Sequence, residues 1–283
     1  MTSNTRNTPE NYYRAAHDVS DTLNALFADG RLAVRNDTSD GCLGVTYYYV
    51  ARTIRNYAAI LTLCERGYGV EAQAILRLML EDTIDVRYIS SDPDVLSEEW
   101  WRHESRSRYY YYMKCLGEGR NPEPPSDLAE LKEGIEADRR EAVDLAGEGA
   151  TPEQVNRLLL KGKWTRMNLH ERAKVANRQW DGTLKAYKFY GYLCEHSHGN
   201  AALAKDCLVP VDGDIRVALD QEGYKSVTPI TLATFYAYWL LHALNSLALD
   251  EFPNLIAVAE RYVDIQGEVP DLDRDGFANA EGL

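Results

Sequence analysis

Two histidines separated by one residue, His196 and His198, lie in the stretch CEHSHGN. In a strand, side chains two residues apart lie on the same side, whereas in a helix they are rotated by about 200°. The flanking residues repeat at spacings of three and four, which predicts a helix here. His198 then shares a helix face with Tyr187, Tyr190 and Cys194, while His196 faces away. The two histidines therefore do not bind one metal ion together.

A metal site at this stretch would need further ligands. Glu195 and His198 have the Glu-x-x-His spacing of carboxylate-bridged di-iron bundles, which require a second such pair, and the chain contains none. Cys194 and His198 are one helical turn apart, and a zinc site would need about two more ligands. We therefore predict no metal and no other cofactor. His198 is then either a core histidine with a hydrogen-bond partner or a site residue.

Arg77 and Glu81 lie one turn apart on an expected helix over residues 70–90. Apolar residues occur on nearly all sides of this helix, which is typical of a buried helix. An unpaired buried charge costs several kcal/mol, so the two side chains are expected to pair. The pair is either a structural salt bridge or part of the lining of a cleft. Asp82 and Asp85 have a DxxD spacing that suits a cation, unless both face water.

Two stretches together resemble the bacterial family called domain of unknown function 5677. They are RTIRNYAAILTLCERGYGVEAQAILRLMLEDTIDVRYI and the later YKFYGYLCEHSHGN, and the resemblance covers residues 40–205. The positions that match the family's motifs are Arg77, Glu81, Tyr187, Tyr190 and His198. Cys194 stands where the family usually has Ser, so no role of a hydroxyl carries over to it. The resemblance implies an all-helical domain and supplies no established reaction.

The composition excludes several classes of protein. The 283 residues carry a net charge of -13, which argues against attraction of the whole surface to nucleic acid or to anionic membranes. No apolar run approaches the roughly 18 residues of a membrane span, and the polar N-terminus has no signal-peptide core. The five cysteines include no CxxC pair and are read as free thiols. A cytoplasmic location is therefore expected.

The spacing of apolar residues is helical nearly throughout, which predicts an all-α, bundle-like single domain. Proline at a first helical position marks helix starts after Thr8, Asp92, Thr151 and Thr228, and a last short helix is expected from Phe252-Pro253. Further helices are expected at residues 44–67, 70–90, 126–147 and 180–205.

One irregular segment at residues 207–225 interrupts the helices, with a short strand expected in DIRVAL. The helical domain is expected to span residues 8–266, followed by a disordered acidic tail at 267–283. The tail sequence DLDRDGFANAE is similar to a calcium-binding EF-hand loop, but position twelve is Gly282 where a glutamate is needed.

Two further segments suggest partners. Residues 157–178 carry seven Lys or Arg against one acid, which indicates either a solvated face or a site for RNA or another anion. Arg166 and His170 are one residue short of the Arg-x(4–6)-His spacing common in helical toxins with ribonuclease activity. The tyrosine runs at 47–49 and 109–112 cannot all be buried in a helix, so packing in the core or in a homo-oligomer is expected.

Three functional readings stay open at this stage. In the first, Arg77 and Tyr187 bind a small anionic ligand, and His198, Glu81 and Tyr190 perform acid–base chemistry. In the second, the same residues form a buried polar network in a scaffold without catalysis. In the third, the basic segment acts on RNA in stress or defence. The sequence does not decide whether the protein is an enzyme.

Overall fold

The computed structural model describes residues 9–26, 35, 38–159, 164–197, 208–211, 214–217 and 224–247. These residues form helices and one short hairpin, which confirms the predicted all-α class. The helices are α1 (Pro9–Ala25), α2 (Asp40–Glu65), α3 (Gly69–Ile89), α4 (Pro93–Gly117), α5 (Leu128–Ala146), α6 (Pro152–Leu158), α7 (Leu169–Ala176), α8 (Thr183–Ser197) and α10 (Tyr224–Leu247). The hairpin pairs β1 (Leu208–Val211) with β2 (Asp214–Val217) in antiparallel register.

The described helices belong to two compact units. The first holds α1, most of α2, α3, α7, α8 and α10, and the second holds the start of α2 with α4, α5 and α6. The predicted domain at residues 8–266 and the tail at 267–283 stay predictions, because residues 248–283 lie outside the described part of the chain. The expected helix at Phe252-Pro253 and the EF-hand-like stretch lie there too.

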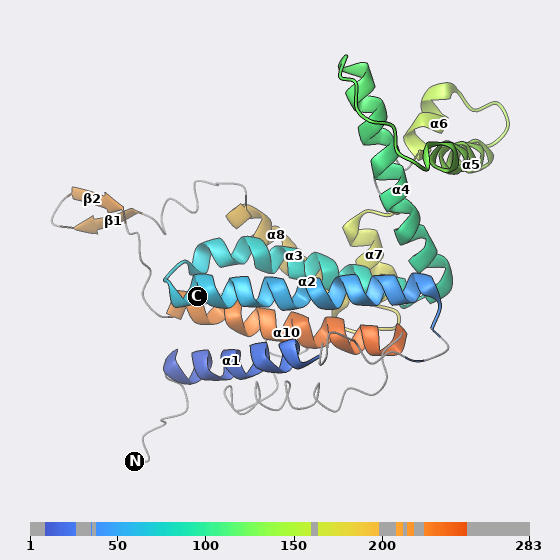
Figure 1. The fold of residues 1–283 in the computed structure, drawn as a ribbon. Coiled ribbons are helices and arrows are strands. Elements are labelled where there is room, and N and C mark those ends of the chain that lie inside the picture. Colours follow the sequence, from blue (N-terminus) through green and yellow to red (C-terminus); the bar gives the residue numbers. More distant parts are fainter. Residues whose placement is uncertain are drawn as a thin grey trace, which may run out of the picture. The chain divides into compact units, whose positions relative to one another are not determined.

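Helix α3 is the centre of the first unit, where it packs against α7, α8 and α10. Figure 1 shows α2, α3 and α10 running alongside one another. The side chains of Leu76, Leu80 and Ile84 are at most 1% exposed, as expected for a helix with apolar residues on nearly all sides. Helix α2 is tied to α10 by the hydrogen bond between the hydroxyls of Tyr57 and Thr234, 2.9 Å long. The central position of α3 fixes the surroundings of each of its polar side chains.

The boundaries of two helices differ from the prediction. Helix α10 begins at Tyr224 and contains Pro229, whereas the sequence predicted a start at Thr228-Pro229. Proline cannot donate the hydrogen bond to the residue four positions earlier and its ring crowds that residue's carbonyl, and at Pro229 both effects are confined to the start of α10. Helix α7 was not predicted as an element, because the charges around it were read as a patch.

Other predicted starts are confirmed. Pro93 is the first residue of α4, and Thr151 forms a capping box with Gln154 at the start of α6. The strand expected in DIRVAL is β2, but its partner β1 was not expected. A two-stranded hairpin has too little periodicity for both strands to be recognised.

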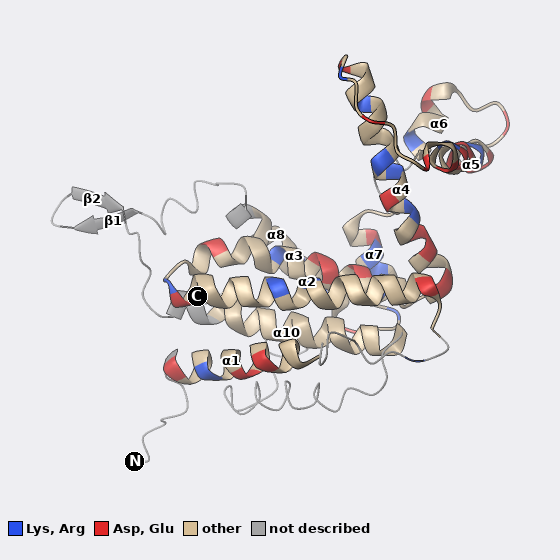
Figure 2. Cartoon of the chain, in the orientation of Figure 1, with Lys and Arg blue, Asp and Glu red and all other residues tan. Residues whose placement is uncertain are grey.

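A buried ion-pair network links α4 and α5 in the second unit. The side chain of Arg106 is 3% exposed and pairs with Asp138 of α5 and Glu99 of its own helix. In α5, Leu131 and Ala142 alone are buried, so the expected exposed, charged helix at residues 126–147 is confirmed. Figure 2 shows mixed acidic and basic residues along α4 and α5, whereas α10 is almost free of charge.

Candidate functional site

Three of the predicted site residues meet where α3 packs against α8. Arg77 donates from Nε to Oε1 of Glu81 over 3.0 Å and from Nη2 to the hydroxyl of Tyr190 over 2.9 Å. The Tyr190 hydroxyl in turn donates to the same oxygen of Glu81 over 2.8 Å. The expected convergence of these residues is therefore confirmed. We call Arg77, Glu81 and Tyr190 the polar cluster.

The polar cluster is less buried than the sequence predicted. The side chain of Arg77 is 22% exposed and that of Glu81 is 30% exposed. The prediction of a buried site was wrong because the apolar residues of α3 do not cover it completely: Leu78, between the two charges in sequence, is itself 38% exposed. Solvent can therefore reach the cluster.

Burial and hydrogen bonding keep Tyr190 protonated. Burial and then the hydrogen bond to the Glu81 carboxylate raise the pKa of Tyr190 well above its ordinary value, so the phenol keeps its proton at neutral pH. Burial works against the charge of Arg77, but the hydrogen bond to Tyr190 and the charge of Glu81 raise its pKa. The cluster thus holds a cation and a proton donor beside the Glu81 carboxyl.

Tyr187, the other predicted ligand-binding residue, belongs to an aromatic stack beside the cluster. Its ring lies 5.6 Å from that of Tyr190 with an angle of 14° between the planes. On its other side the ring of His170, from α7, stacks at 4.9 Å and 16°. The guanidinium carbon of Arg77 lies 5.0 Å from the centre of the Tyr190 ring. His170 was weighed only as part of a ribonuclease motif, and no spacing in the sequence links it to α8.

His198, the predicted acid or base, lies outside the described residues. The structure extends α8 to Ser197, so the expected helical conformation is confirmed up to that residue. The side chains of Glu195, His196 and Ser197 are likewise outside the described part. Whether His198 reaches the polar cluster stays a prediction.

The two aspartates of the DxxD pattern point to different arginines. Asp82 accepts from Nε of Arg52 on α2 over 2.6 Å, and Asp85 pairs with Arg172 of α7 over 2.9 Å. Burial raises the pKa of Asp82 to about 6 despite the neighbouring Arg52. Each aspartate is thus neutralised by a guanidinium, and the described residues contain no cluster of three metal-ligating side chains.

The basic segment 157–178 is partly neutralised. Arg166 donates to Glu141 over 2.7 Å, and Arg172 pairs with Asp85 as described above. Lys161 and Lys163 lie outside the described residues. The segment therefore offers less free positive charge to RNA than its sequence indicates.

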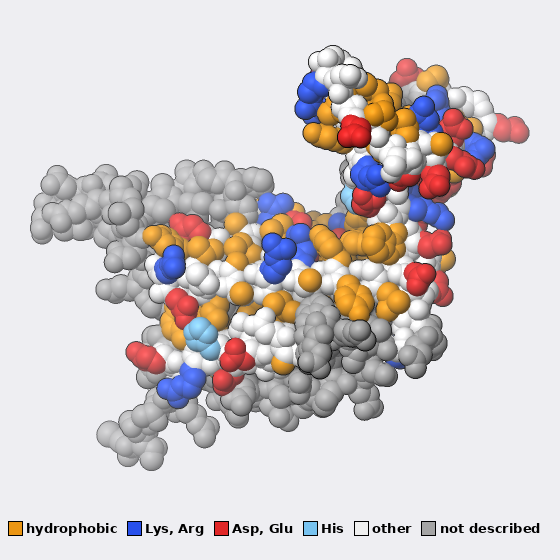
Figure 3. Space-filling model, in the orientation of Figure 1, with side chains coloured by type: hydrophobic (Ala, Val, Ile, Leu, Met, Phe, Trp, Pro, Cys, Tyr) orange, Lys and Arg blue, Asp and Glu red, His pale blue; other side chains and the backbone are white. Residues whose placement is uncertain are grey.

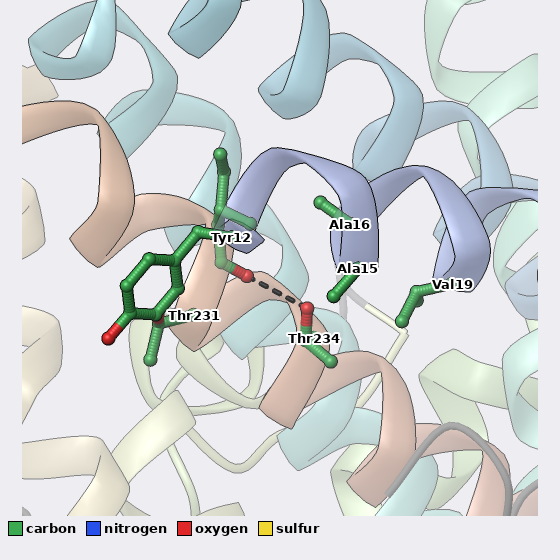
Figure 4. A pocket seen from close by; sticks show the side chains of 7 residues that line it. Tyr12, Ala15, Ala16, Val19, Thr231 and Thr234 are labelled. Carbon is green, nitrogen blue, oxygen red and sulfur yellow. Dashed lines mark hydrogen bonds between the residues drawn. The ribbon is translucent and has the colours of Figure 1, made fainter. Parts of the chain in front are cut away.

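Two cavities lie away from the polar cluster. The one in Figure 4, between α1 and α10, has a volume of about 10 Å³, close to the minimum for one water molecule. Apolar side chains such as Val19 line much of it. The hydroxyl of Thr234 donates a hydrogen bond to the carbonyl of Ile230 over 3.0 Å. The other, of about 580 Å³, lies in the second unit beside α5 and α6. Neither contains a predicted site residue.

The fold and the polar cluster define an all-helical domain with a partly exposed arginine–glutamate–tyrosine network. A family model matches residues 44–214, more than half of the chain, and is described as a family of unknown function, DUF5677. The chain belongs to this family, as the sequence predicted. No curated protein and no solved structure matches the chain. None of the described helices is both long enough and apolar enough to cross a membrane.

Proposed function

We propose that the polar cluster binds a small anionic ligand and exchanges a proton with it. The observation that carries this proposal is the arrangement of Glu81. Its Oε1 accepts hydrogen bonds from both Arg77 and Tyr190, while no described residue donates to Oε2. A carboxylate that is fixed through one oxygen, with no donor from the described residues on the other and 30% of the side chain exposed, is positioned to accept a proton.

Arg77 supports the binding of the anionic group. Its planar fork matches a carboxylate or a phosphate, and its charge is permanent at neutral pH. The ligand's anion would approach beside Glu81, so binding must compete with the existing ion pair. We therefore expect modest affinity unless the ligand also donates a hydrogen bond to Oε2 of Glu81.

Tyr190 and the stack behind it supply the remaining parts of the site. The Tyr190 phenol is a neutral donor, and its position is fixed by Arg77 and by the ring of Tyr187. Proton transfer would run between the ligand and Glu81, with Tyr190 holding the carboxylate in place. His198 would add a second acid or base if α8 brings it to the cluster.

A melting experiment with candidate ligands tests the proposal. Inorganic phosphate, citrate and adenosine monophosphate are added separately to the full chain, and the melting temperature is measured. A ligand at 100 times its dissociation constant stabilises the protein by about 2.7 kcal/mol. We expect at least one of the three to raise the melting temperature of the wild type, and to do so far less in Arg77→Gln.

Glu81→Gln and a control variant complete the experiment. Glu81→Gln should bind a ligand that needs only Arg77 but lose any proton exchange. Arg102→Gln is the control, because Arg102 is 59% exposed and pairs only with neighbouring acids of its own helix. Equal increases of the melting temperature in the wild type and in Arg77→Gln would overturn the proposal and favour a structural role for the cluster.

Binding of RNA by residues 157–178 is the weaker candidate. Its support is the basic composition of the segment, and the ion pairs of Arg166 and Arg172 count against it. A role in stress or defence would depend on that binding.

A further inference from the structure

A second arginine of α3, Arg87, is buried without an acidic partner. Its side chain is 4% exposed and lies in the last turn of the helix. Nη1 donates to the hydroxyl of Thr183 over 2.8 Å, and Nε is buried with no hydrogen-bond partner. Within the described part of the chain, no carboxylate pairs with Arg87. A buried guanidinium with one unsatisfied N–H and no carboxylate partner is rare, because desolvation of the charge is only partly compensated.

Aromatic rings surround the Arg87 guanidinium. Its carbon lies 3.6 Å from the ring centre of Trp239 and 5.5 Å from that of Trp180. The Trp180 ring meets His242 edge-on at 5.2 Å, and its indole N–H donates to Ser90. The rings and the carbonyl end of α3 stabilise a positive charge, but neither supplies the acceptor that Nε lacks. We call Arg87, Trp180, Trp239 and Thr183 the arginine cage.

The charge of Arg87 is not cancelled by its surroundings. Burial lowers the pKa of Arg87 to about 9, so the group is still protonated at neutral pH. Burial and then the positive charge of Arg87 lower the pKa of His242. The nearest acid in sequence to Thr183, Asp181, accepts a hydrogen bond from the backbone N–H of Gly182. An anion at the cage would therefore meet one uncompensated cation.

We propose that the arginine cage is a second ligand site, which binds the oxyanion of a small molecule, a phosphate or a carboxylate. The buried Nε is the donor that the anion would occupy, and the indole rings would pack against the apolar part of the ligand. The cage lies close to solvent, because Trp180 and Trp239 are only half-buried and His242 is exposed.

The cage is separate from the polar cluster. Arg77 and Arg87 are ten residues apart on α3, which corresponds to about 15 Å along the helix axis. Both contact α8, Arg77 through Tyr190 and Arg87 through Thr183. The test below includes an Arg77 variant, so that failure of one site is distinguished from failure of the other.

Titration of the full-length protein with inorganic phosphate and, separately, with acetate tests the cage. The ionic strength is held constant, and binding is followed by tryptophan fluorescence and by calorimetry. We expect a saturable change in fluorescence, because Trp180 and Trp239 flank the site. The phosphate arm and the acetate arm distinguish the two sources of the oxyanion. No saturable binding of either anion to the wild type at up to about 50 mM, a Kd range typical of the weakest specific ligands, would overturn the proposal.

Variants locate the binding. Arg87→Met should abolish the saturable fluorescence change that reports the cage, and Arg87→Lys should weaken the affinity obtained from that change at least about tenfold, because an ammonium lacks the planar fork. Arg77→Gln should leave this binding unchanged. Trp180→Phe should remove much of the fluorescence change, whereas Trp164→Phe, in the second unit, should not.

Two results would contradict the assignment even if anions bind. Unchanged affinity in Arg87→Lys and Arg87→Met would place the anion elsewhere. Loss of binding in Arg77→Gln alone would assign it to the polar cluster. If Arg87→Met does not fold, Arg87→Lys and the wild-type titration still decide the question.

Discussion

Arg77 and Arg87 stand on one helix and have opposite surroundings. Arg77 is 22% exposed and bonds to Glu81 one turn away, whereas Arg87 is 4% exposed and bonds to a hydroxyl and two indole rings. The residue four positions after Arg77 is an acid, and the residue four positions after Arg87 is Ser91. Local sequence therefore neutralises the first arginine but not the second.

The comparison shows that the more buried of the two arginines of α3 is not the one that has a carboxylate partner. A charge at the margin of the helix bundle has a carboxylate, although water could have solvated it. Arg87, inside the bundle, has no carboxylate partner in the described part of the chain, although a buried charge needs one more than an exposed charge does. Figure 3 shows that the visible face carries basic groups beside hydrophobic ones, so an arginine at the margin is not unusual on this surface. The buried arginine is the exception that calls for a ligand or a strong structural reason.

The largest expected effect is on the free energy of unfolding when Arg87 is replaced. Two variants separate the contribution of its packing from that of its charge. Arg87→Ala should lower the free energy of unfolding by about 3 kcal/mol, because it removes a long side chain stacked on Trp239 and leaves a cavity. Arg87→Met fills much of that space without a charge and should be neutral or stabilising. Urea unfolding measures both. Equal losses in the two variants would mean that the charge itself stabilises the fold.

A third charge of α3, Asp82, tests the effect of burial on an ion pair. It is 7% exposed, and its pKa in the folded protein is about 6, above its ordinary value of 3.8. The folded state then binds the proton more tightly than the unfolded state, so the contribution of Asp82 to stability falls as pH rises from about 4 to 6. The difference across this range is about 2 kcal/mol, from a shift of roughly two units.

Urea unfolding of Asp82→Asn between pH 4 and pH 7 measures this contribution. The wild type should become less stable as the pH rises from about 4 to 6, and the Asp82→Asn variant should lack this decrease. Asp21→Asn, at an exposed position of α1, is the matched control and should retain it. If the free energy of unfolding changes with pH by the same amount in the wild type, Asp82→Asn and Asp21→Asn, then Asp82 does not titrate in this range. That result would show that the charge of Arg52 outweighs burial and keeps Asp82 ionised.

A smaller effect concerns the hydrogen bonds of the polar cluster. Tyr190→Phe removes one donor and one acceptor and should cost about 1 kcal/mol, since the cluster is partly solvated. Glu81→Gln should cost a similar amount. Tyr187→Phe keeps the stacked ring and is the control. A loss above about 3 kcal/mol in Tyr190→Phe would indicate a structural core network in place of a ligand site.

The smallest effect is expected outside α3, at the basic segment. Because Arg166 and Arg172 are ion-paired, we expect only weak RNA binding that disappears between about 50 and 200 mM salt. Filter binding with single-stranded RNA measures it, and Lys174→Gln should reduce it only slightly. Tight binding that persists at 200 mM salt would revive the RNA-binding reading and show that paired arginines are available to a ligand.

Several features of the fold and site were readable from the sequence because they depend on local spacing. The apolar periodicity predicted helices at α2 and α3, the charged stretch at residues 126–147 predicted α5, and proline and threonine marked the starts of α4 and α6. The i,i+4 spacing predicted the ion pair of Arg77 with Glu81. The family motifs added Tyr190, which lies more than a hundred positions away along the chain.

The sequence by itself determined the helical class, the family and the pairing of neighbours on one helix, because each follows from spacings of three and four residues. Only the tertiary structure decided which charges are buried. Asp82 and Asp85 are three residues apart, yet they pair with Arg52 of α2 and Arg172 of α7. Arg87 pairs with no acid among the described residues, and Trp180 and Trp239 contact it from separate segments. The burial of a charge depends on how helices distant in sequence pack around it, and no local pattern encodes that packing.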